Sequence, residues 1–237
     1  MNYLVSLFAA VICTLACCSV SMAADNQLTK QEQQDGWELL FNGTDYDGWK
    51  CNNGNEIASD VVDNAMQPYK SGGYIIIYDK QFGDFVLKCE VKMPESCNSG
   101  IFFRVENPVD PVNTGFEAQI ATGNGTGCHD FGAIYDLVPT TKNASKGPGQ
   151  WDSVEIQCEG AEFSVKVNGE LVCQMNADEL DQPGERAIAG DHKYKLNGKS
   201  RAVKDFARAG YLGFQDHGHP VWYKNVKVLP LSQEKKN

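Results

Sequence analysis

Glu117 and Gln119 are the first residues whose types and spacing could do chemistry. They lie two positions apart within residues 116–121, where apolar and polar side chains alternate. Successive side chains of a β-strand point to opposite faces, so this pair shares one face while Phe116, Ala118 and Ile120 share the other. A carboxylate beside a carboxamide on one face of a sheet forms a polar site that the sheet closes on one side. An ordinary solvent-facing strand has the same pattern, so a functional site requires other polar groups to converge here.

A histidine-containing segment, residues 213–220, supplies the second group of candidates. It carries Gln215, Asp216, His217 and His219 at the end of a predicted strand. Histidine titrates near neutral pH, so it can act as a base, an acid or a metal ligand. We predict Glu117 or His217 as a catalytic base, with Asp216 orienting His217. An ordinary polar turn would explain Asp216 equally well.

Other side chains are candidates for binding a metal or a ligand. His129 and Asp130 could coordinate a metal ion or cap a loop. A divalent metal held by Glu117, His217 or His129 could polarise a carbonyl group. Tryptophan can stack on a sugar ring, although a buried tryptophan is the commoner outcome. The candidates for substrate binding are Asn98, Arg104, Gln119, Gln215, Trp49 and Trp222.

Two familiar hydrolase mechanisms fit the sequence poorly. A G-x-S-x-G segment, which would present a serine nucleophile, is absent. Retaining glucanases of the laminarinase type, which share a sandwich fold, need two carboxylates about 5 Å apart. Glu117 has no acidic neighbour on its predicted strand. A conventional two-carboxylate hydrolase therefore fits this sequence poorly.

Composition and charge limit the classes of partner. The chain has 237 residues, a hydrophobic content of 42% and a formal net charge of -10. Counterion release at a nucleic acid or an anionic membrane requires a basic face, so neither is expected as a partner. A small neutral carbohydrate is unaffected by this charge.

Residues 1–23 contain no charged side chain and are typical of a secretory signal peptide. Small residues at positions 21 and 23 favour cleavage before Ala24 or Asp25. A membrane anchor, or lipid attachment at Cys17 or Cys18, is the competing interpretation. We expect a periplasmic or extracellular protein, in which disulfides are permitted. The cysteines outside the leader are Cys51, Cys89, Cys97, Cys128, Cys158 and Cys173.

Period-two alternation predicts an all-β chain with little helix. We expect one domain over residues 36–231, between a mobile lead-in at 24–35 and a polar tail at 232–237. Asn168-Gly169 predicts a tight hairpin, residues 178–180 could form one helical turn, and the basic segment 184–208 is interpreted as a long inserted loop. Two half-apolar sheets must bury their faces against each other, so a jelly-roll sandwich is predicted. The strand candidates are residues 75–78, 85–93, 101–105, 116–121, 154–158, 163–167, 171–175, 211–215 and 222–229.

Eight segments match, in sequence order, the motifs of one known protein family. They are residues 38–49, 82–85, 98–104, 116–120, 132–135, 149–151, 167–169 and 213–226. On these motifs the chain resembles the 3-keto-disaccharide hydrolases over residues 36–231. The resemblance implies a jelly roll of the concanavalin A-like lectin/glucanase type, in exported bacterial proteins of glycan metabolism. The basic segment 184–208 and the extra cysteines depart from the family pattern.

The resemblance also implies an activity, cleavage of the glycosidic bond in 3-keto-disaccharides or 3-keto-glycosides. A keto group at C3 acidifies the hydrogen at C2, and its removal gives an enolate that can expel the oxygen at C1 before water adds. This route needs one base and a group that holds the enolate. Arg104 and Gln119 could bind the oxyanion or sugar hydroxyls. The alternatives are a non-catalytic, lectin-like carbohydrate-binding module and a structural cell-surface protein.

Overall fold

The structure, a computed structural model, describes residues 24–182, 195–196 and 199–231. The predicted signal peptide, part of the basic segment and the polar tail lie outside the described residues. Among the described residues, no helix is long and apolar enough to cross a membrane.

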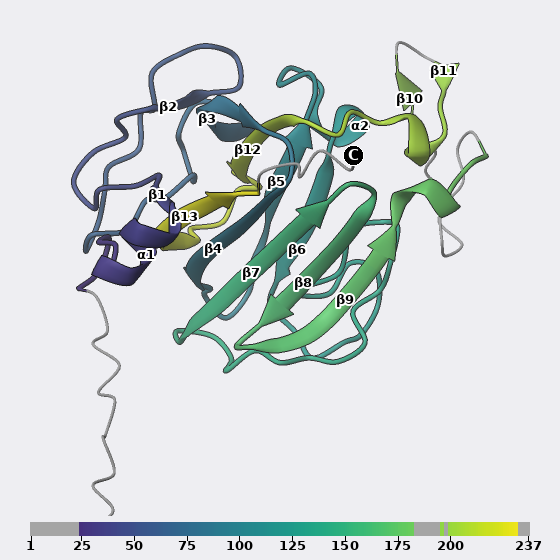
Figure 1. The fold of residues 1–237 in the computed structure, drawn as a ribbon. Helices are drawn as coiled ribbons and strands as arrows, with labels where there is room; N and C mark the ends of the chain where they lie inside the picture. The colour runs from purple at the N-terminus through teal and green to yellow at the C-terminus, as the bar shows by residue number, and fades with distance from the viewer. Residues whose placement is uncertain (1–23, 183–194, 197–198, 232–237) are drawn as a thin grey trace, which may run out of the picture.

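Two large antiparallel sheets form a sandwich in the described part of the chain, which confirms the predicted all-β fold (Figure 1). In the order in which they pair, the strands of the six-stranded sheet are β1 (Glu38–Leu39), β13 (Trp222–Pro230), β4 (Phe85–Lys92), β7 (Trp151–Glu159), β8 (Glu162–Val167) and β9 (Glu170–Asn176). Those of the five-stranded sheet are β2 (Trp49–Cys51), β3 (Ile75–Phe82), β12 (Gly210–Gln215), β5 (Asn98–Val105) and β6 (Phe116–Ala121).

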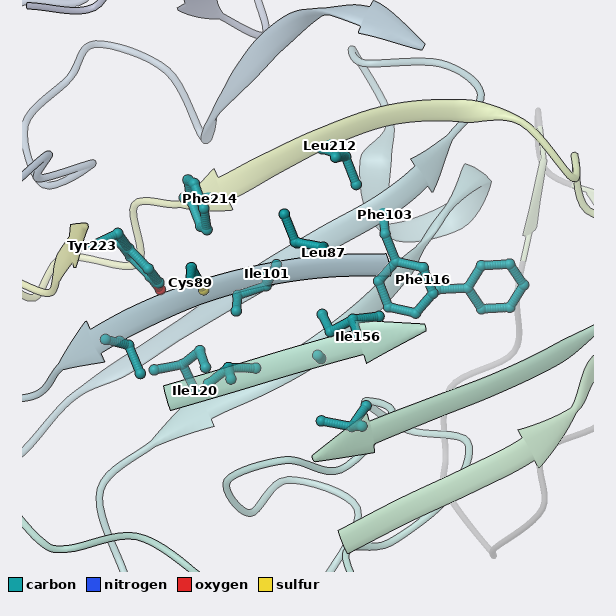
Figure 2. Close-up of a cluster of buried hydrophobic side chains, with 14 of the residues drawn as sticks. Leu87, Cys89, Ile101, Phe103, Phe116, Ile120, Ile156, Leu212, Phe214 and Tyr223 are labelled. Carbon is teal, nitrogen blue, oxygen red and sulfur yellow. The ribbon is translucent and has the colours of Figure 1, made fainter. Parts of the chain in front are cut away.

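Alternating apolar side chains of the two sheets meet in one core. In β4 every second residue is buried and the residues between them are half-buried. Figure 2 shows Leu87 and Ile156 of the six-stranded sheet among Ile101, Phe103 and Phe116 of the five-stranded sheet. Burial of these alternate positions leaves the second face of each sheet free to carry polar groups.

The turn predicted at Asn168-Gly169 is confirmed. Both residues have a left-handed backbone, with φ of 51° and 81°, as a type I′ hairpin between β8 and β9 requires. The turn expected at 178–180 is the 3₁₀ helix η1 (Ala177–Glu179).

Two segments differ from the sequence-based expectation. Residues 24–35, expected to be a mobile lead-in, contain the helix α1 (Lys30–Asp35), which begins with a capping box formed by Thr29 and Glu32. Ion pairs from Glu32 to Lys227 and from Asp25 to Lys224 hold this segment against β13. These contacts depend on tertiary structure and leave no periodic signal in the sequence.

The basic segment 184–208 was expected to be one long loop. Its described part contains the paired strands β10 (Lys195–Leu196) and β11 (Lys199–Ser200), followed by the 3₁₀ helix η2 (Val203–Asp205). Val203 and Phe206 are buried in the main core. Few apolar residues of this segment reach the core, and their spacing is irregular. The sequence therefore shows no periodicity that would reveal them.

Within the described structure, the six cysteines outside the leader form no disulfide with one another. Cys89 and Cys158 point into the core from β4 and β7, and burial raises the pKa of both thiols. They pack as small apolar side chains, which confirms the interpretation of these two positions.

Arg104, near the end of β5, ties the β3–β4 turn to the β7–β8 turn at one end of the sandwich. Its side chain is fully buried and lies over the Phe163 ring. The guanidinium donates to Gly83 O at 3.2 Å, to Gly160 O at 2.6 Å and to the Asp84 carboxylate at 2.7 Å. This cation and the family motif at residues 82–85 therefore have a structural role.

Removing the Arg104 charge should destabilise the fold. Arg104→Met leaves the carboxylate of Asp84 without its cation, and breaking a buried ion pair in this way costs about 3–5 kcal/mol. Lys50→Met is the control, because the Lys50–Asp79 pair lies on the surface and should contribute less than about 1 kcal/mol. Urea unfolding measures both free energies, and equal losses in the two variants would contradict the role assigned to Arg104.

Candidate active site

The polar face is the side of the five-stranded sheet that points away from the main core. Glu117 and Gln119 reach it from β6, as the alternation predicts, because Phe116, Ala118 and Ile120 lie in the core. Phe102 pairs with Glu117 and Gly100 with Gln119. On the other side of β5, Gly213 of β12 pairs with Phe102.

Three of the predicted binding residues meet on this face. Continuing the β12 register by two residues places Gln215 beside Gly100, in one row with Gln119. Asn98 lies on the same face of β5, two residues before Gly100, and accepts a hydrogen bond from Gln119. The structure therefore brings Glu117, Gln119, Asn98 and Gln215 together.

Gly100 provides the space that the Glu117 carboxyl occupies. A Cβ atom at position 100 would lie 2.0 Å from Glu117 Oε1 and 2.6 Å from its carboxyl carbon. The carboxyl therefore leans along the sheet from its own row into the row that contains Gln119 and Gln215. A glycine at this place positions a carboxylate between two carboxamides.

The Glu117 carboxyl is buried and electrostatically strained. The residue is 7% exposed. Loss of hydration is the main cause that raises its pKa from an ordinary value of 4.5 to about 8, and the negative charge of Asp136 adds to the shift. Within the described ranges no side chain or backbone group hydrogen-bonds to its carboxyl oxygens. The group is therefore free to exchange a proton with a ligand.

Asp136 reaches this position from a segment that lies along the free edge of β6. Gly132 N donates to Gln119 O at 2.9 Å, and Tyr135 N donates to Glu117 O at 2.8 Å. Asp136 follows with a left-handed φ of 62° and is buried. Its carboxylate lies 2.7 Å from Nε2 of His129, whose side chain is largely exposed. The family motif at residues 132–135 thus extends the sheet and places a second carboxylate near Glu117.

Two carboxamide oxygens on the polar face lack a hydrogen-bond donor. Gln119 Nε2 donates to Asn98 Oδ1 at 3.0 Å, and Gln215 Nε2 donates to Tyr74 Oη at 2.6 Å. The Oε1 atoms of both glutamines are buried and have no partner among the described residues. Buried acceptors are normally satisfied, so these two indicate a ligand or water that donates hydrogen bonds on either side of Glu117.

Arg104, Trp49 and Trp222 are not part of this site. Strand alternation alone would put Arg104 on the polar face, but its left-handed φ of 50° breaks the alternation and turns the side chain inward. Trp49 is buried, stacks on Phe214 and donates its indole N–H to Leu40 O. Trp222 lies on the outer face of the six-stranded sheet, where it packs against Lys92.

The residues after β12 have separate roles. The Asp216 carboxylate accepts hydrogen bonds from Lys70 N at 2.7 Å and Gly218 N at 2.9 Å, so its oxygens hold two backbone segments rather than orient His217. His217 is exposed and His219 is half-buried. Asp130 accepts a hydrogen bond from Gly127 N, the loop-capping role weighed against metal binding.

The sequence offers Glu117, His217 and His129 as candidate ligands of a divalent metal. The part of the chain that the structure describes contains no group of three or more His, Cys, Asp or Glu residues placed to hold a metal ion. Glu117, His217 and His129 do not form such a group, and His129 is paired with Asp136.

Sequence reasoning missed Tyr74, Gly100 and Asp136. Gly100 belongs to the motif at residues 98–104, and its role depends on a contact with Glu117 of the neighbouring strand, which the sequence does not show. Asp136 follows the motif at residues 132–135 directly, which is the one signal that could have identified it. Tyr74 lies far from the other site residues in the sequence.

A cavity of about 380 Å³ lies elsewhere, on the outer face of the six-stranded sheet beneath the N-terminal segment. Its charged lining is already paired: Glu155 contacts Lys166 and Lys88, and Glu32 contacts Lys227. None of the site candidates lines it, so we place the candidate site on the polar face.

Filling the space at Gly100 should displace the Glu117 carboxyl. Gly100→Ala inserts a methyl group into a packed position, which costs about 1–3 kcal/mol, and a crystal structure of the variant should show the carboxyl moved off β5. Gly83→Ala is the matched control, because a Cβ there meets no atom within 4 Å. Urea unfolding compares the two variants. An unmoved carboxyl and equal stability would contradict the packing described.

A family model described as a 3-keto-alpha-glucoside-1,2-lyase-like domain matches residues 36–229. A curated relative from Bacteroides thetaiotaomicron, named 3-keto-disaccharide hydrolase, is 21% identical over 253 residues, which cover 90% of this chain and 84% of the relative.

Solved structures show the same fold. One from Parabacteroides distasonis, described as a candidate glycosyl hydrolase, is 25% identical, with a TM-score of 0.70 over 88% of this chain and 100% of that chain. A second from the same organism is 22% identical, with a TM-score of 0.66 over 82% of this chain and 99% of that chain. The match of the family model spans most of the sequence, including every residue of the polar face. The chain therefore belongs to the 3-keto-alpha-glucoside-1,2-lyase-like family, which confirms the resemblance inferred from its motifs.

Proposed function

We propose that this protein cleaves the glycosidic bond of 3-keto-glycosides, with Glu117 as the base. The buried Glu117 carboxyl, set between two unpaired carboxamide oxygens, carries the proposal. The family description and the name of the Bacteroides relative support the reaction class. Both names describe action on 3-keto sugars.

The proposed reaction begins at C2 of the oxidised sugar. The Glu117 carboxylate takes the C2 proton, and the electron pair of the C–H bond forms a C2=C3 double bond while the ketone oxygen becomes negative. The pair then returns to form C1=C2, the C3 ketone is restored, and the C1–O bond breaks. Its electrons go to the leaving oxygen, which takes the proton held by Glu117 and so regenerates the carboxylate. Addition of water across C1=C2, with the hydroxyl on C1 and the proton on C2, completes hydrolysis.

The electrostatics of Glu117 suit this first step. A general base works best when its pKa lies near the working pH, because it is then both ionised and basic. A carboxylate of ordinary pKa 4.5 is a weak base, whereas burial of Glu117 raises its pKa to about 8. One such carboxylate replaces the pair that a conventional glycosidase needs.

The two carboxamides suit a sugar ring. A carbohydrate supplies several hydroxyl donors, and the Oε1 atoms of Gln119 and Gln215 are buried acceptors without a donor among the described residues. Hydroxyls that donate to both would hold the ring over Glu117. Because the sugar is neutral, carboxamide oxygens can bind its hydroxyls without a cationic side chain.

The names of the family and of the relative differ in the final step of the reaction. The family is described as lyase-like and the Bacteroides relative as a hydrolase. Elimination across C1 and C2 belongs to both outcomes, and only the hydrolase adds water. The base is therefore the same in either case.

A lectin-like module is the less favoured alternative. Binding a neutral sugar does not require a buried carboxylate, and burying one without a hydrogen-bond partner opposes folding. A buried Glu117 carboxyl is instead what a proton-transfer step requires.

A substrate comparison tests the proposal. The purified protein, with and without a chelator, is incubated with 3-keto disaccharides and with the unoxidised parent sugars, and released sugar is measured by chromatography. We expect cleavage of the keto forms alone. Glu117→Gln should lower turnover by a factor of about 10² or more, whereas His217→Gln should remain within a few-fold of the wild type.

The outcomes separate the alternatives. Sugar binding without any cleavage would favour the lectin-like module. Near-normal turnover in Glu117→Gln would remove Glu117 from the role of base, and a large loss in His217→Gln would assign that role to the histidine instead.

A further inference from the structure

Tyr74 stands at the edge of the polar face, immediately before β3. Its backbone is fixed on both sides, because Tyr74 N donates to Asn52 Oδ1 at 3.0 Å and Tyr74 O accepts from Asp216 N at 2.9 Å. The ring packs edge-on against Phe102 with 6.2 Å between centroids. Phe102 is the residue directly opposite Glu117 on the neighbouring strand. Tyr74 and Glu117 are close enough for the charge of Glu117 to affect the phenol.

Hydrogen bonding leaves the phenol proton unused. Gln215 Nε2 donates to Tyr74 Oη at 2.6 Å, so the oxygen is the acceptor in that bond. A phenol has one proton to donate, and no group in the described part of the chain accepts it. Tyr74 is 40% exposed, so this proton can reach a ligand on the polar face.

The phenol also stays protonated across the working pH range. Burial, and then the negative charge of Glu117, raise the pKa of Tyr74 to about 12. A neutral O–H held in place by a neighbouring amide is a preorganised hydrogen-bond donor. Such donors act where negative charge develops during a reaction.

We propose that Tyr74 is a further catalytic residue, whose hydroxyl donates a hydrogen bond to the oxygen at C3 when Glu117 removes the proton from C2. This inference rests on the proposed function. The C2–H bond breaks and its proton moves to the Glu117 carboxylate. The electron pair of that bond forms C2=C3, and the ketone π pair moves onto the C3 oxygen. Tyr74 keeps its proton throughout and stabilises that oxyanion through the hydrogen bond, so the step needs no other reactant.

The Gln215–Tyr74 contact explains a second feature of the site. Gln215 spends one amide hydrogen on Tyr74 and leaves its buried Oε1 atom free for a sugar hydroxyl. One side chain thus orients the oxyanion donor and contacts the ring. Arg104, the oxyanion group expected from the sequence, is replaced in this role by a neutral donor.

Tyr74→Phe tests the proposal, since it keeps the ring against Phe102 and removes only the hydroxyl. Loss of one oxyanion donor typically lowers kcat by a factor of about 10²–10³, with little change in KM for the 3-keto disaccharide. Tyr211→Phe is the matched control, because Tyr211 borders the same apolar patch with Phe102. That variant should keep wild-type kinetics.

The readouts distinguish this inference from the proposed function. A wild-type protein that does not cleave 3-keto substrates would refute the proposed function itself. Active wild type together with unchanged kcat in Tyr74→Phe, or a rise in KM alone, would overturn only the role of Tyr74. Should Tyr74→Phe not fold, 3,5-difluorotyrosine at position 74 preserves the shape and lowers the phenol pKa. It should make activity fall at a lower alkaline pH than in the wild type, and an unchanged alkaline limb would overturn the proposal.

Discussion

The burial of the Glu117 carboxyl beside Asp136 is the interaction on which the site depends. The pKa of Glu117 is about 8 in the folded protein against an ordinary 4.5, so its ionisation opposes folding. The protonated carboxyl favours the folded state. That stabilisation is complete below pH 4.5 and is lost as the pH rises through about 8. The rest of the sandwich must hold the carboxylate in place against that penalty, which is the usual relation between a reactive group and its scaffold.

Three parts of the fold supply that support. The core between the sheets fixes β5 and β6, so that Gly100 and Glu117 stay in register. The segment at residues 132–135 adds hydrogen bonds along the edge of β6 and brings Asp136. At the far end, Arg104 connects the β3–β4 and β7–β8 turns through buried contacts. On the polar face, buried carboxamide oxygens without a partner among the described residues lie on both sides of a carboxyl, and this arrangement is available to a ligand.

The sequence predicted the sheets well and the site in part. Alternation in β6 placed Glu117 and Gln119 on one face because the buried side of a strand leaves a period of two. The same rule cannot locate Arg104, because its left-handed backbone reverses the alternation before Val105. Gly100 and Tyr74 could not be found in this way, because their roles come from contacts between strands that are distant in the sequence. The helix α1 is likewise stabilised by ion pairs to β13 rather than by periodicity.

Glu117 therefore links the fold to its chemistry: one carboxylate, made basic by its surroundings, next to neutral groups that orient a sugar. A titration of the Glu117 side chain tests this most directly. Carbon NMR of the protein labelled at the glutamate carboxyl carbon, with Glu117→Gln to assign the signal, follows its ionisation against pH. The account predicts a midpoint near 8. A midpoint near 4.5 would contradict it, since Glu117 would then be an ordinary solvated carboxylate.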